Sequence, residues 1–357
     1  MKGSKSHIPG WLAFLLSVAF VFSAVAVIIF AYLTFQVVIQ RPLNPMDNAV
    51  AEIADIDLQL EQDGPLLSAP TIELGMPTPT LFPTQEPWGG TDRVNLLLMG
   101  IDRRPGQAFI SRTDSMMIVS IDPATESISI LSVPRDLYVT IPGRGRDRIN
   151  TAFVYGASGN NPEGGASLAI QTVAYNLGVP IDHYLMVDFS AVTKGIDILG
   201  GIDVYVAQAI NDPTYPDMNY GYDPLFIPAG TQHLDGEMAL KYARTRHADT
   251  DFGRAARQQQ VMISARDKAL SLGVGSLLTK APSIYRQLES GVKTDLSLDQ
   301  LIALAKTVSE IPKENIQNEV LGYDYVSSYR TENGAHVLIL NNATAGPLIQ
   351  EMFYNNE

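Results

Sequence analysis

Residues Val94–Ile101 read VNLLLMGI, and this short apolar run decides the fold class. Apolar side chains fill nearly every position, which is typical of a strand buried on both faces of a sheet. Two similar runs follow, Ser115–Ile121 and Ser127–Val133, and the turn Asp122–Thr125 separates them. We therefore predict three neighbouring buried strands at the centre of one domain.

Strand and helix patterns alternate along the rest of this domain. Further strands are expected at Tyr138–Ile141, His183–Phe189, Gly201–Val206, Ile316–Val320 and His336–Leu340. Helices are expected at Gly165–Leu177, Ala191–Leu199, Leu234–Tyr242, Arg254–Leu272, Ser276–Glu289, Leu298–Glu310 and Ala343–Phe353. The alternation predicts an α/β fold, an αβα sandwich in which helices cover both faces of a central mixed sheet.

The composition limits the chemistry. The chain has 357 residues, a formal net charge of −13 and no cysteine. The absence of cysteine excludes disulfides, thiolate metal sites and a cysteine nucleophile. The five histidines are scattered and show no metal-binding spacing.

An uncharged apolar run, Leu12–Ile39, lies near the N-terminus. A membrane-spanning helix needs about 20 such residues, so we predict a cytoplasmic tail at 1–10 and a transmembrane helix at 11–40. A cleaved signal peptide is the alternative. The run is long for one and no clear cleavage site follows it, so we favour a retained anchor.

Charge around this run sets its orientation. Lys2 and Lys5 precede it, whereas acidic residues accumulate after Arg41 and the next basic residue is Arg93. The excess of basic residues on the N-terminal side predicts a single-pass protein of the cell membrane, with its N-terminus in the cytoplasm and the rest of the chain after the helix outside it. Proline-rich residues 41–91 are expected to form an extracytoplasmic linker to a domain at 92–357.

A second stretch, Tyr242–Gln260 (YARTRHADTDFGRAARQQQ), concentrates positive charge in an acidic chain. If Tyr242–Arg246 is extended, Arg244 and Arg246 project from one face. If a helix opens near Gly253, then Arg254, Arg257 and Gln258 share a face. Together with a helix N-terminus they would form an oxyanion site, most simply for phosphate or pyrophosphate. A solvated helix face paired with Asp249 and Asp251 is the alternative.

Charged residues also stand at the ends of the three central strands. Asp102 and Arg104 follow the first strand, Asp114 precedes the second, and Arg135 follows the third. Open α/β sheets commonly hold ligands at strand ends. The two acids are otherwise explained as strand-end caps, paired with Arg103 and Arg112.

A basic loop, Pro142–Arg148 (PGRGRDR), follows the fourth strand. Its arginines could contact a polyanion, but a solvated loop is the expectation.

Six motifs in order resemble the LytR–CpsA–Psr family. They are NLLLMGIDRR from Asn95, SRTDSMMIVSIDP from Ser111, ISILSVPRDLYVTIPG from Ile128, DRINTAFVYG from Asp147, VDFSAVTKGIDILGGIDV from Val187 and ALKYARTRHADTDFGRAARQQQ from Ala239. The core of the resemblance covers residues 94–260, and weaker similarity continues to the C-terminus.

The resemblance implies a hydrophobic lipid pocket and a transferase activity. The donor would be a polyprenyl-pyrophosphate-linked glycan and the acceptor a hydroxyl of peptidoglycan or another surface polymer, with a phosphodiester as the product. Asp102 and Asp114 correspond to carboxylates near Mg²⁺ (or Mn²⁺) and, with Arg135, to the catalytic set. The pyrophosphate-binding set is Arg104, Arg135, Arg244, Arg246, Arg254, Arg257 and Gln258.

The residues themselves are compatible with this chemistry. Phosphoryl transfer depends mainly on positioning and on neutralising negative charge, and no nucleotide-binding GxxxxGK[ST] motif is present. A lipid-linked pyrophosphate brings its own high-energy bond. The expected partners are therefore the lipid-linked glycan, a wall acceptor and the membrane, with no nucleic acid. A lipid pyrophosphatase and a non-catalytic binding or regulatory module remain the alternatives.

Overall fold

The computed structural model describes residues 92–103, 107–159, 161–217, 221–246 and 250–354. The predicted tail, transmembrane helix and linker, together with Arg104 and Asp249, lie outside the described residues. Within the described ranges no helix combines the length and the apolar character that a bilayer crossing requires.

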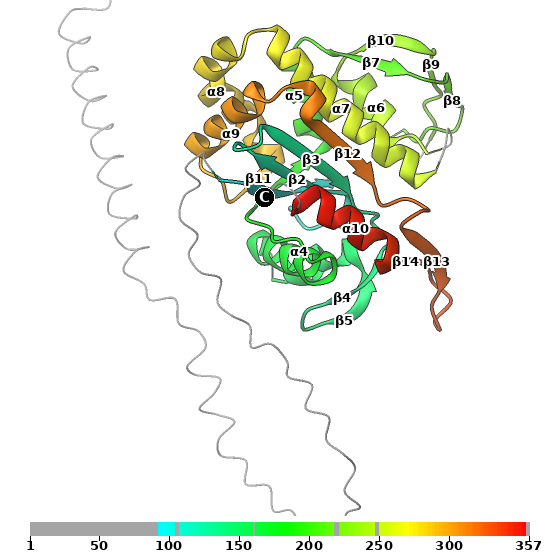
Figure 1. Ribbon diagram of the computed structural model, residues 1–357. Coiled ribbons are helices and arrows are strands. Elements are labelled where there is room, and N and C mark those ends of the chain that lie inside the picture. Colours follow the sequence, from blue (N-terminus) through cyan, green and yellow to red (C-terminus); the bar gives the residue numbers. More distant parts are fainter. Residues whose placement is uncertain (1–91, 104–106, 160, 218–220, 247–249, 355–357) are drawn as a thin grey trace, which may run out of the picture. The chain divides into compact units, whose positions relative to one another are not determined.

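A six-stranded mixed sheet forms the centre of the domain, in the order β11-β6-β1-β2-β3-β12 (Figure 1). Its strands are β1 (Val94–Ile101), β2 (Thr113–Asp122), β3 (Ser127–Ser132), β6 (His183–Asp188), β11 (Val292–Thr294) and β12 (Ile316–Val320). Strand β2 is antiparallel to β1 and β3, whereas β1 with β6 and β3 with β12 are parallel. The three predicted central strands are thus confirmed as neighbours.

One face of the sheet packs against three helices, α3 (Ala152–Gly156), α4 (Pro162–Leu177) and α10 (Asn342–Phe353). Leu97 and Met99 of β1 point to this side and are fully buried with Val173 of α4 and Met352 of α10. Because strand side chains alternate, Leu96 and Leu98 point to the other side.

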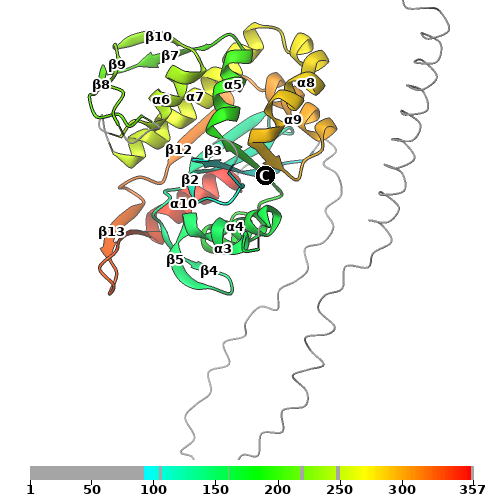
Figure 2. The same ribbon diagram turned by 180° about the vertical axis from the view of Figure 1, so that it is seen from behind.

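That second face is covered by α7 (Asp251–Ser271) and α9 (Leu298–Glu310). Around them lie α5 (Phe189–Ile198), α6 (Gly236–Arg244) and α8 (Val274–Leu288). Figures 1 and 2 show α4 and α10 on one side of the sheet and α5 to α9 on the other. The predicted αβα sandwich with a mixed sheet is therefore confirmed.

Four two-stranded sheets stand outside the central one. They are β4 (Tyr138–Ile141) with β5 (Gly145–Arg148), β7 (Ile202–Val206) with β10 (Gly230–Leu234), β8 (Ile210–Asp212) with β9 (Leu225–Ile227), and β13 (Val326–Arg330) with β14 (His336–Leu340). Short 3-10 helices are at Ile149–Thr151, Glu289–Gly291 and Lys313–Asn315. The basic loop predicted at Pro142–Arg148 was wrong in part, because its second half is strand β5.

Local signals place the ends of the helices near the site. Helix α7 begins at Asp251 because the hydroxyl of Thr250 accepts a hydrogen bond from the Gly253 N–H at 3.4 Å. Helix α6 continues to Arg244, so the extended conformation considered for Tyr242–Arg246 was wrong for most of that segment. Chain direction changes at Thr245, which has an extended backbone, and this brings the start of α7 close to the end of α6.

Candidate functional site

A polar cleft lies at the end of the central sheet, where β1 ends, β2 begins and β3 has just ended. Ile101 pairs with Thr113 across the β1–β2 ladder, and Asp114 lies at the register shift between the Gly100 and Ile101 pairs. Asp102, which follows β1, and Asp114 both line the cleft. The cleft consists of two adjoining hollows that share Asp114, Ser115, Arg254 and Gln258. Their other charged lining residues are Asp102, Arg135, Asp136, Asp212, Arg244, Arg246 and Asp251.

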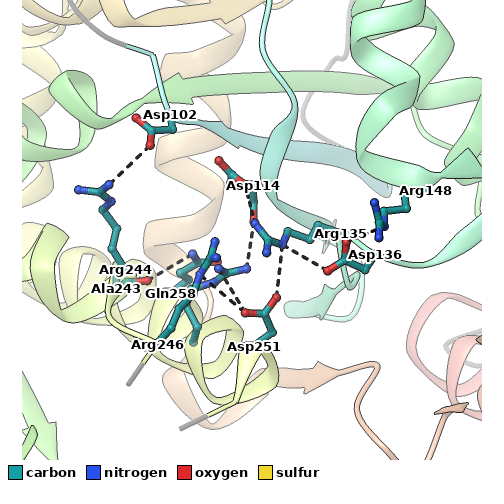
Figure 3. Close-up of polar contacts among 11 residues, drawn as sticks. Asp102, Asp114, Arg135, Asp136, Arg148, Ala243, Arg244, Arg246, Asp251 and Gln258 are labelled. Atoms are coloured by element: carbon teal, nitrogen blue, oxygen red, sulfur yellow. Dashed lines mark hydrogen bonds and ion pairs between the residues drawn. The ribbon is translucent and has the colours of Figure 1, made fainter. Parts of the chain in front are cut away.

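Arg135 stands between three carboxylates (Figure 3). Its Nη1 donates to Asp114 Oδ1 at 2.8 Å, and its Nε lies 3.3 Å from Asp251 Oδ2 and 3.5 Å from Asp136 Oδ2. Burial opposes the charged form, but the three carboxylates together raise the pKa of Arg135. The guanidinium is therefore charged and held in one orientation at the edge of the cleft.

Arg254 is the most deeply buried cation of the cleft, with 6% of its surface exposed. Its contacts are long: Nη1 lies 3.4 Å from Asp251 Oδ1, Nη2 is 3.4 Å from the Asp114 carbonyl oxygen, and Nε has no partner. Burial lowers the pKa of Arg254 to about 10, with Arg246 and Arg135 acting in the same direction and Asp251 opposing them. A buried cation with an unused donor is primed to bind an anion.

Asp251 is the acid around which three arginines gather. Its carboxylate lies 3.3 Å from Arg135, 3.4 Å from Arg254 and 3.8 Å from Arg246. The sequence offered Asp251 only as an ion-pair partner of a solvated helix, and not as a site residue. The available signal was its position just before Arg254, at the start of the stretch where a helix was expected.

Arg244 holds the opposite wall of the cleft. Its guanidinium lies 3.5 Å from Asp102, donates to the Tyr215 hydroxyl at 3.2 Å, and stacks 4.3 Å from the centre of the Phe189 ring. The sequence did not single out Phe189. Tyr215, which is buried, packs against Arg244 from the loop before β9.

Arg257 does not reach this cleft. Its guanidinium donates to the carbonyl oxygens of Tyr242, at 2.8 Å, and Thr245, and it lines a hollow on the other flank of α7. Gln258 does reach the cleft and donates to the Ala243 carbonyl at 3.4 Å. The structure therefore brings together every described residue of the predicted set except Arg257, which braces α6 against α7.

Two carboxylates offer oxygen ligands to a metal ion. Asp102 and Asp114 line the same hollow and are 40% and 34% exposed at the side chain. In the described part of the chain, no three or more acidic or histidine side chains gather in a way that could hold a metal by themselves. Mg²⁺ usually takes one or two carboxylates and completes its shell with phosphate and water, so the two acids fit an ion that arrives with a phosphate ligand.

An apolar cavity opens close to the cleft, between β6, α5, α8 and α9. It is open to solvent and has a volume of about 380 Å³, and its walls are almost entirely aliphatic. Val187, Ala191 and Val192 line it, whereas the intervening Phe189 lines the polar cleft. Helix α8 turns Leu277, Leu278, Ala281, Ile284 and Leu288 to the cavity, yet none of its residues is buried. The apolar face of α8 is therefore only partly covered by the neighbouring helices.

The αβα sandwich therefore carries an arginine-rich polar cleft and an aliphatic cavity close to it. The chain belongs to the LytR_cpsA_psr family, whose model matches residues 77–353.

Two similar proteins from other organisms carry the same name. The chain is 40% identical over 215 residues to the polyisoprenyl-teichoic acid–peptidoglycan teichoic acid transferase TagU of Oceanobacillus iheyensis, covering 60% of this chain and 62% of that protein. It is 32% identical to the protein of the same name from Bacillus licheniformis, covering 65% of this chain and 69% of the relative. The matched segment thus spans just under two thirds of the first relative.

Solved structures agree at the level of the fold. A structure of TagT bound to LIIa-WTA superposes with a TM-score of 0.58 at 26% identity, covering 76% of this chain and 93% of that one. The crystal structure of TagV from Bacillus subtilis superposes with a TM-score of 0.59 at 27% identity, covering 74% of this chain and 98% of that one.

Proposed function

We propose that this protein transfers a glycopolymer phosphate from a polyprenyl-pyrophosphate carrier to a hydroxyl group of a cell-wall acceptor, which we take to be peptidoglycan. The observation that supports it most is the convergence of Arg135, Arg244, Arg246 and Arg254 on one cleft close to an aliphatic cavity. The family relatives named as teichoic acid transferases support the same reaction.

The charge of the cleft suits a pyrophosphate diester. Such a group carries two negative charges, and guanidinium groups can bind phosphate oxygens through paired hydrogen bonds. The guanidinium groups of Arg135 and Arg254 both lie in the cleft, and the Nε donors of both have no hydrogen-bond partner. Asp251 lies between them and acts as an internal counter-ion that the pyrophosphate would replace.

The reaction is a displacement at phosphorus. The acceptor hydroxyl oxygen forms a bond to the sugar-side phosphorus, and the bond from this phosphorus to the bridging oxygen breaks. Asp102 or Asp114 accepts the hydroxyl proton, and polyprenyl phosphate leaves with the bridging oxygen. Arg135 and Arg254 stabilise the charge that develops on the phosphate oxygens, which is the principal form of catalysis in phosphoryl transfer.

The carrier chain would occupy the apolar cavity. A polyprenyl chain is flexible and branched, and the aliphatic walls supplied by α5, α8 and α9 match its chemistry. Burying that chain there stabilises the complex by about 25 cal/mol for each Å² removed from water. The junction of β6 and α5 separates the cavity from the cleft by only a few residues, so one ligand can enter both.

A divalent ion fits the site. Asp102 and Asp114 would hold Mg²⁺, and the ion would neutralise charge on the pyrophosphate when bound. We also propose that the chain is anchored by residues 11–40, with the catalytic domain outside the cytoplasm, since the carrier's chain resides in the membrane.

A reconstituted transfer reaction tests the proposal. The full chain in detergent micelles would be incubated with a polyprenyl-pyrophosphoryl oligosaccharide, Mg²⁺ and a peptidoglycan fragment. A phosphodiester-linked product is the expected outcome. Release of free sugar phosphate without linkage would instead identify a hydrolase. Binding without any turnover would identify a non-catalytic module, and either result would overturn the proposed transfer.

A further inference from the structure

Two aromatic rings stand beside the polar cleft and take no part in the displacement at phosphorus. Phe252, the second residue of α7, lines the hollow that also contains Arg135, Asp136 and Asp251. The ring of Tyr323 meets the ring of Phe252 at 82°, with 4.6 Å between the two ring centres. Phe252 is half-buried, whereas Tyr323 is 68% exposed. A large exposed ring is therefore fixed next to this hollow.

The turn that carries Tyr323 is held by the chain on both sides. Before the turn, the N–H of Leu321 donates to the carbonyl oxygen of Ser132, at the end of β3, at 3.1 Å. After the tyrosine, the carbonyl oxygen of Tyr325 accepts from the N–H of Asn341 at 2.8 Å. A ring on a backbone held in this way loses little entropy when a ligand packs against it. The exposed ring is thus suited to bind a ligand.

The two hollows of the cleft differ in what lies next to them. One contains Phe189, whose neighbours in the sequence line the apolar cavity. The hollow beside Phe252 is lined instead by Val320 of β12 and Leu338 of β14. In both views β12 runs from the side of α8 and α9 towards the β13–β14 hairpin at the other end of the domain (Figures 1 and 2). The order is therefore apolar cavity, Phe189 hollow, Phe252 hollow and then Tyr323.

The chemistry of the transfer brings the acceptor to the end with the two rings. In phosphoryl transfer the attacking and leaving oxygens lie roughly in line, on opposite sides of the phosphorus. The leaving group is polyprenyl phosphate, whose chain would occupy the apolar cavity. The acceptor hydroxyl must then approach from the opposite side, where Phe252 and Tyr323 lie. The donor glycan is bonded to the phosphorus through an oxygen outside this line.

A sugar ring is a suitable partner for an exposed aromatic side chain. One face of a pyranose ring presents C–H groups, which pack against the electron-rich face of an aromatic ring. The hydroxyl groups at the edge of the sugar stay free to hydrogen bond, and the carboxylate of Asp136 in the same hollow can accept from them. An acyclic alcohol has no such apolar face and would gain little from the two rings.

We propose that Tyr323 and Phe252 form the subsite that holds a sugar ring of the acceptor and directs its hydroxyl group to the phosphorus. This inference rests on the proposed function, because the direction of attack comes from it. It adds a basis for specificity, since the subsite selects an acceptor by its saccharide ring and not by the hydroxyl group alone.

Three variants of the full chain test this subsite. Tyr323→Ala removes the exposed ring, and Tyr323→Phe keeps the ring without its hydroxyl group. Tyr175→Ala removes a ring of similar exposure, 63%, from α4 on the other side of the sheet, and it is the matched control.

Each protein would be assayed in detergent micelles with Mg²⁺, with either the peptidoglycan fragment or the polyprenyl-pyrophosphoryl oligosaccharide varied. A calorimetric titration with the peptidoglycan fragment, in the presence of inorganic pyrophosphate, measures acceptor binding without turnover. A separate titration with pyrophosphate alone shows whether the arginine cleft is intact in each variant.

Tyr323→Ala is expected to raise the KM for the peptidoglycan fragment and to weaken its binding, each about three- to tenfold, as expected for the loss of one ring contact. The KM for the lipid-linked donor and the affinity for pyrophosphate should stay unchanged. Tyr323→Phe should behave like the unmodified chain, because it keeps the ring. Tyr175→Ala should change none of these quantities.

Three outcomes would overturn the inference. They are unchanged acceptor binding in Tyr323→Ala, an equal loss in Tyr175→Ala, or a higher KM for the donor alone, which would place the donor's own sugar against the ring. Absence of transfer by the unmodified chain would count against the proposed function instead. The titration with the peptidoglycan fragment would still decide whether Tyr323 binds it, so the two failures are distinguishable.

Discussion

Replacing Arg254 by methionine should stabilise the ligand-free protein while abolishing pyrophosphate binding. Arg254 is 6% exposed, its ion pair with Asp251 and its hydrogen bond to the Asp114 carbonyl oxygen are both long, and its Nε has no partner. A buried charge with poor compensation destabilises a fold, and an apolar side chain of similar size removes this cost.

The structure gives the magnitude. Burial lowers the pKa of Arg254 to about 10, which corresponds to about 3 kcal/mol against the charged form. Loss of the contacts to Asp251 and Asp114 offsets part of this, so we expect a net gain of about 1–2 kcal/mol. For a domain of this size the melting temperature should rise by about 2–6 °C.

Arg257→Met is the matched control, one turn along the same helix. Its guanidinium is fully engaged with the carbonyl oxygens of Tyr242 and Thr245, so methionine would leave both buried acceptors unpaired. We expect a loss of about 2–4 kcal/mol. The assay is thermal unfolding of both variants with and without pyrophosphate, together with calorimetric titration. If Arg254→Met is destabilised like the control, or still binds pyrophosphate, our reasoning about this residue is wrong.

Three other changes probe the same account. Asp251→Asn should tighten pyrophosphate binding by about tenfold in a titration, because it removes an anion that competes for the arginines. The carboxylate is 40% exposed, and we expect its interaction with the arginines to contribute about 1 kcal/mol or more. Weaker binding by the variant would contradict this. Arg135→Ala should lower the transfer rate about 10²–10³-fold, or about 3–4 kcal/mol, and full activity of the purified variant would count against its role. Burial raises the pKa of Tyr184 to about 12, so between about pH 10 and pH 12 this tyrosine ionises in the unfolded chain only and the free energy of unfolding should fall. Tyr184→Phe should therefore move alkaline unfolding, followed at 295 nm, to higher pH. An unchanged midpoint would exclude Tyr184 as the cause.

The central strands could be predicted from the sequence because burial on both faces leaves a continuous apolar run. Val94–Ile101 is strand β1 with the same bounds, and Asp102 after it and Asp114 in β2 line the same hollow. Strand β11 could not be predicted, because it is only three residues long and it is defined by pairing with β6, which is distant in the sequence.

Which residues of the arginine stretch face the cleft could be predicted only in part from the sequence. Arg254 and Gln258 are four residues apart on α7, which corresponds to about 40° around the helix, and both line the cleft. Arg257 lies about 60° from Arg254 on the other side, and the end of α6 supplies two carbonyl oxygens there. Spacing alone grouped all three residues, but the position of α6 decides which of them face the cleft.

The role of Asp251 also depends on tertiary structure. Its partner Arg135 comes from the end of β3, more than one hundred positions earlier, and only the packing of α7 against the sheet brings the two within 3.3 Å. The sequence placed Arg135 after a strand and named Asp251 as a possible ion-pair partner, but it could not show that the two meet.

A crystal structure of the protein with a short-chain prenyl pyrophosphate and Mg²⁺ tests the central claim most directly. We predict density for the two phosphates between Arg135, Arg246 and Arg254, with Asp251 displaced and the prenyl chain in the cavity beneath α8. Phosphates bound on another surface, or a prenyl chain left outside that cavity, would contradict the account.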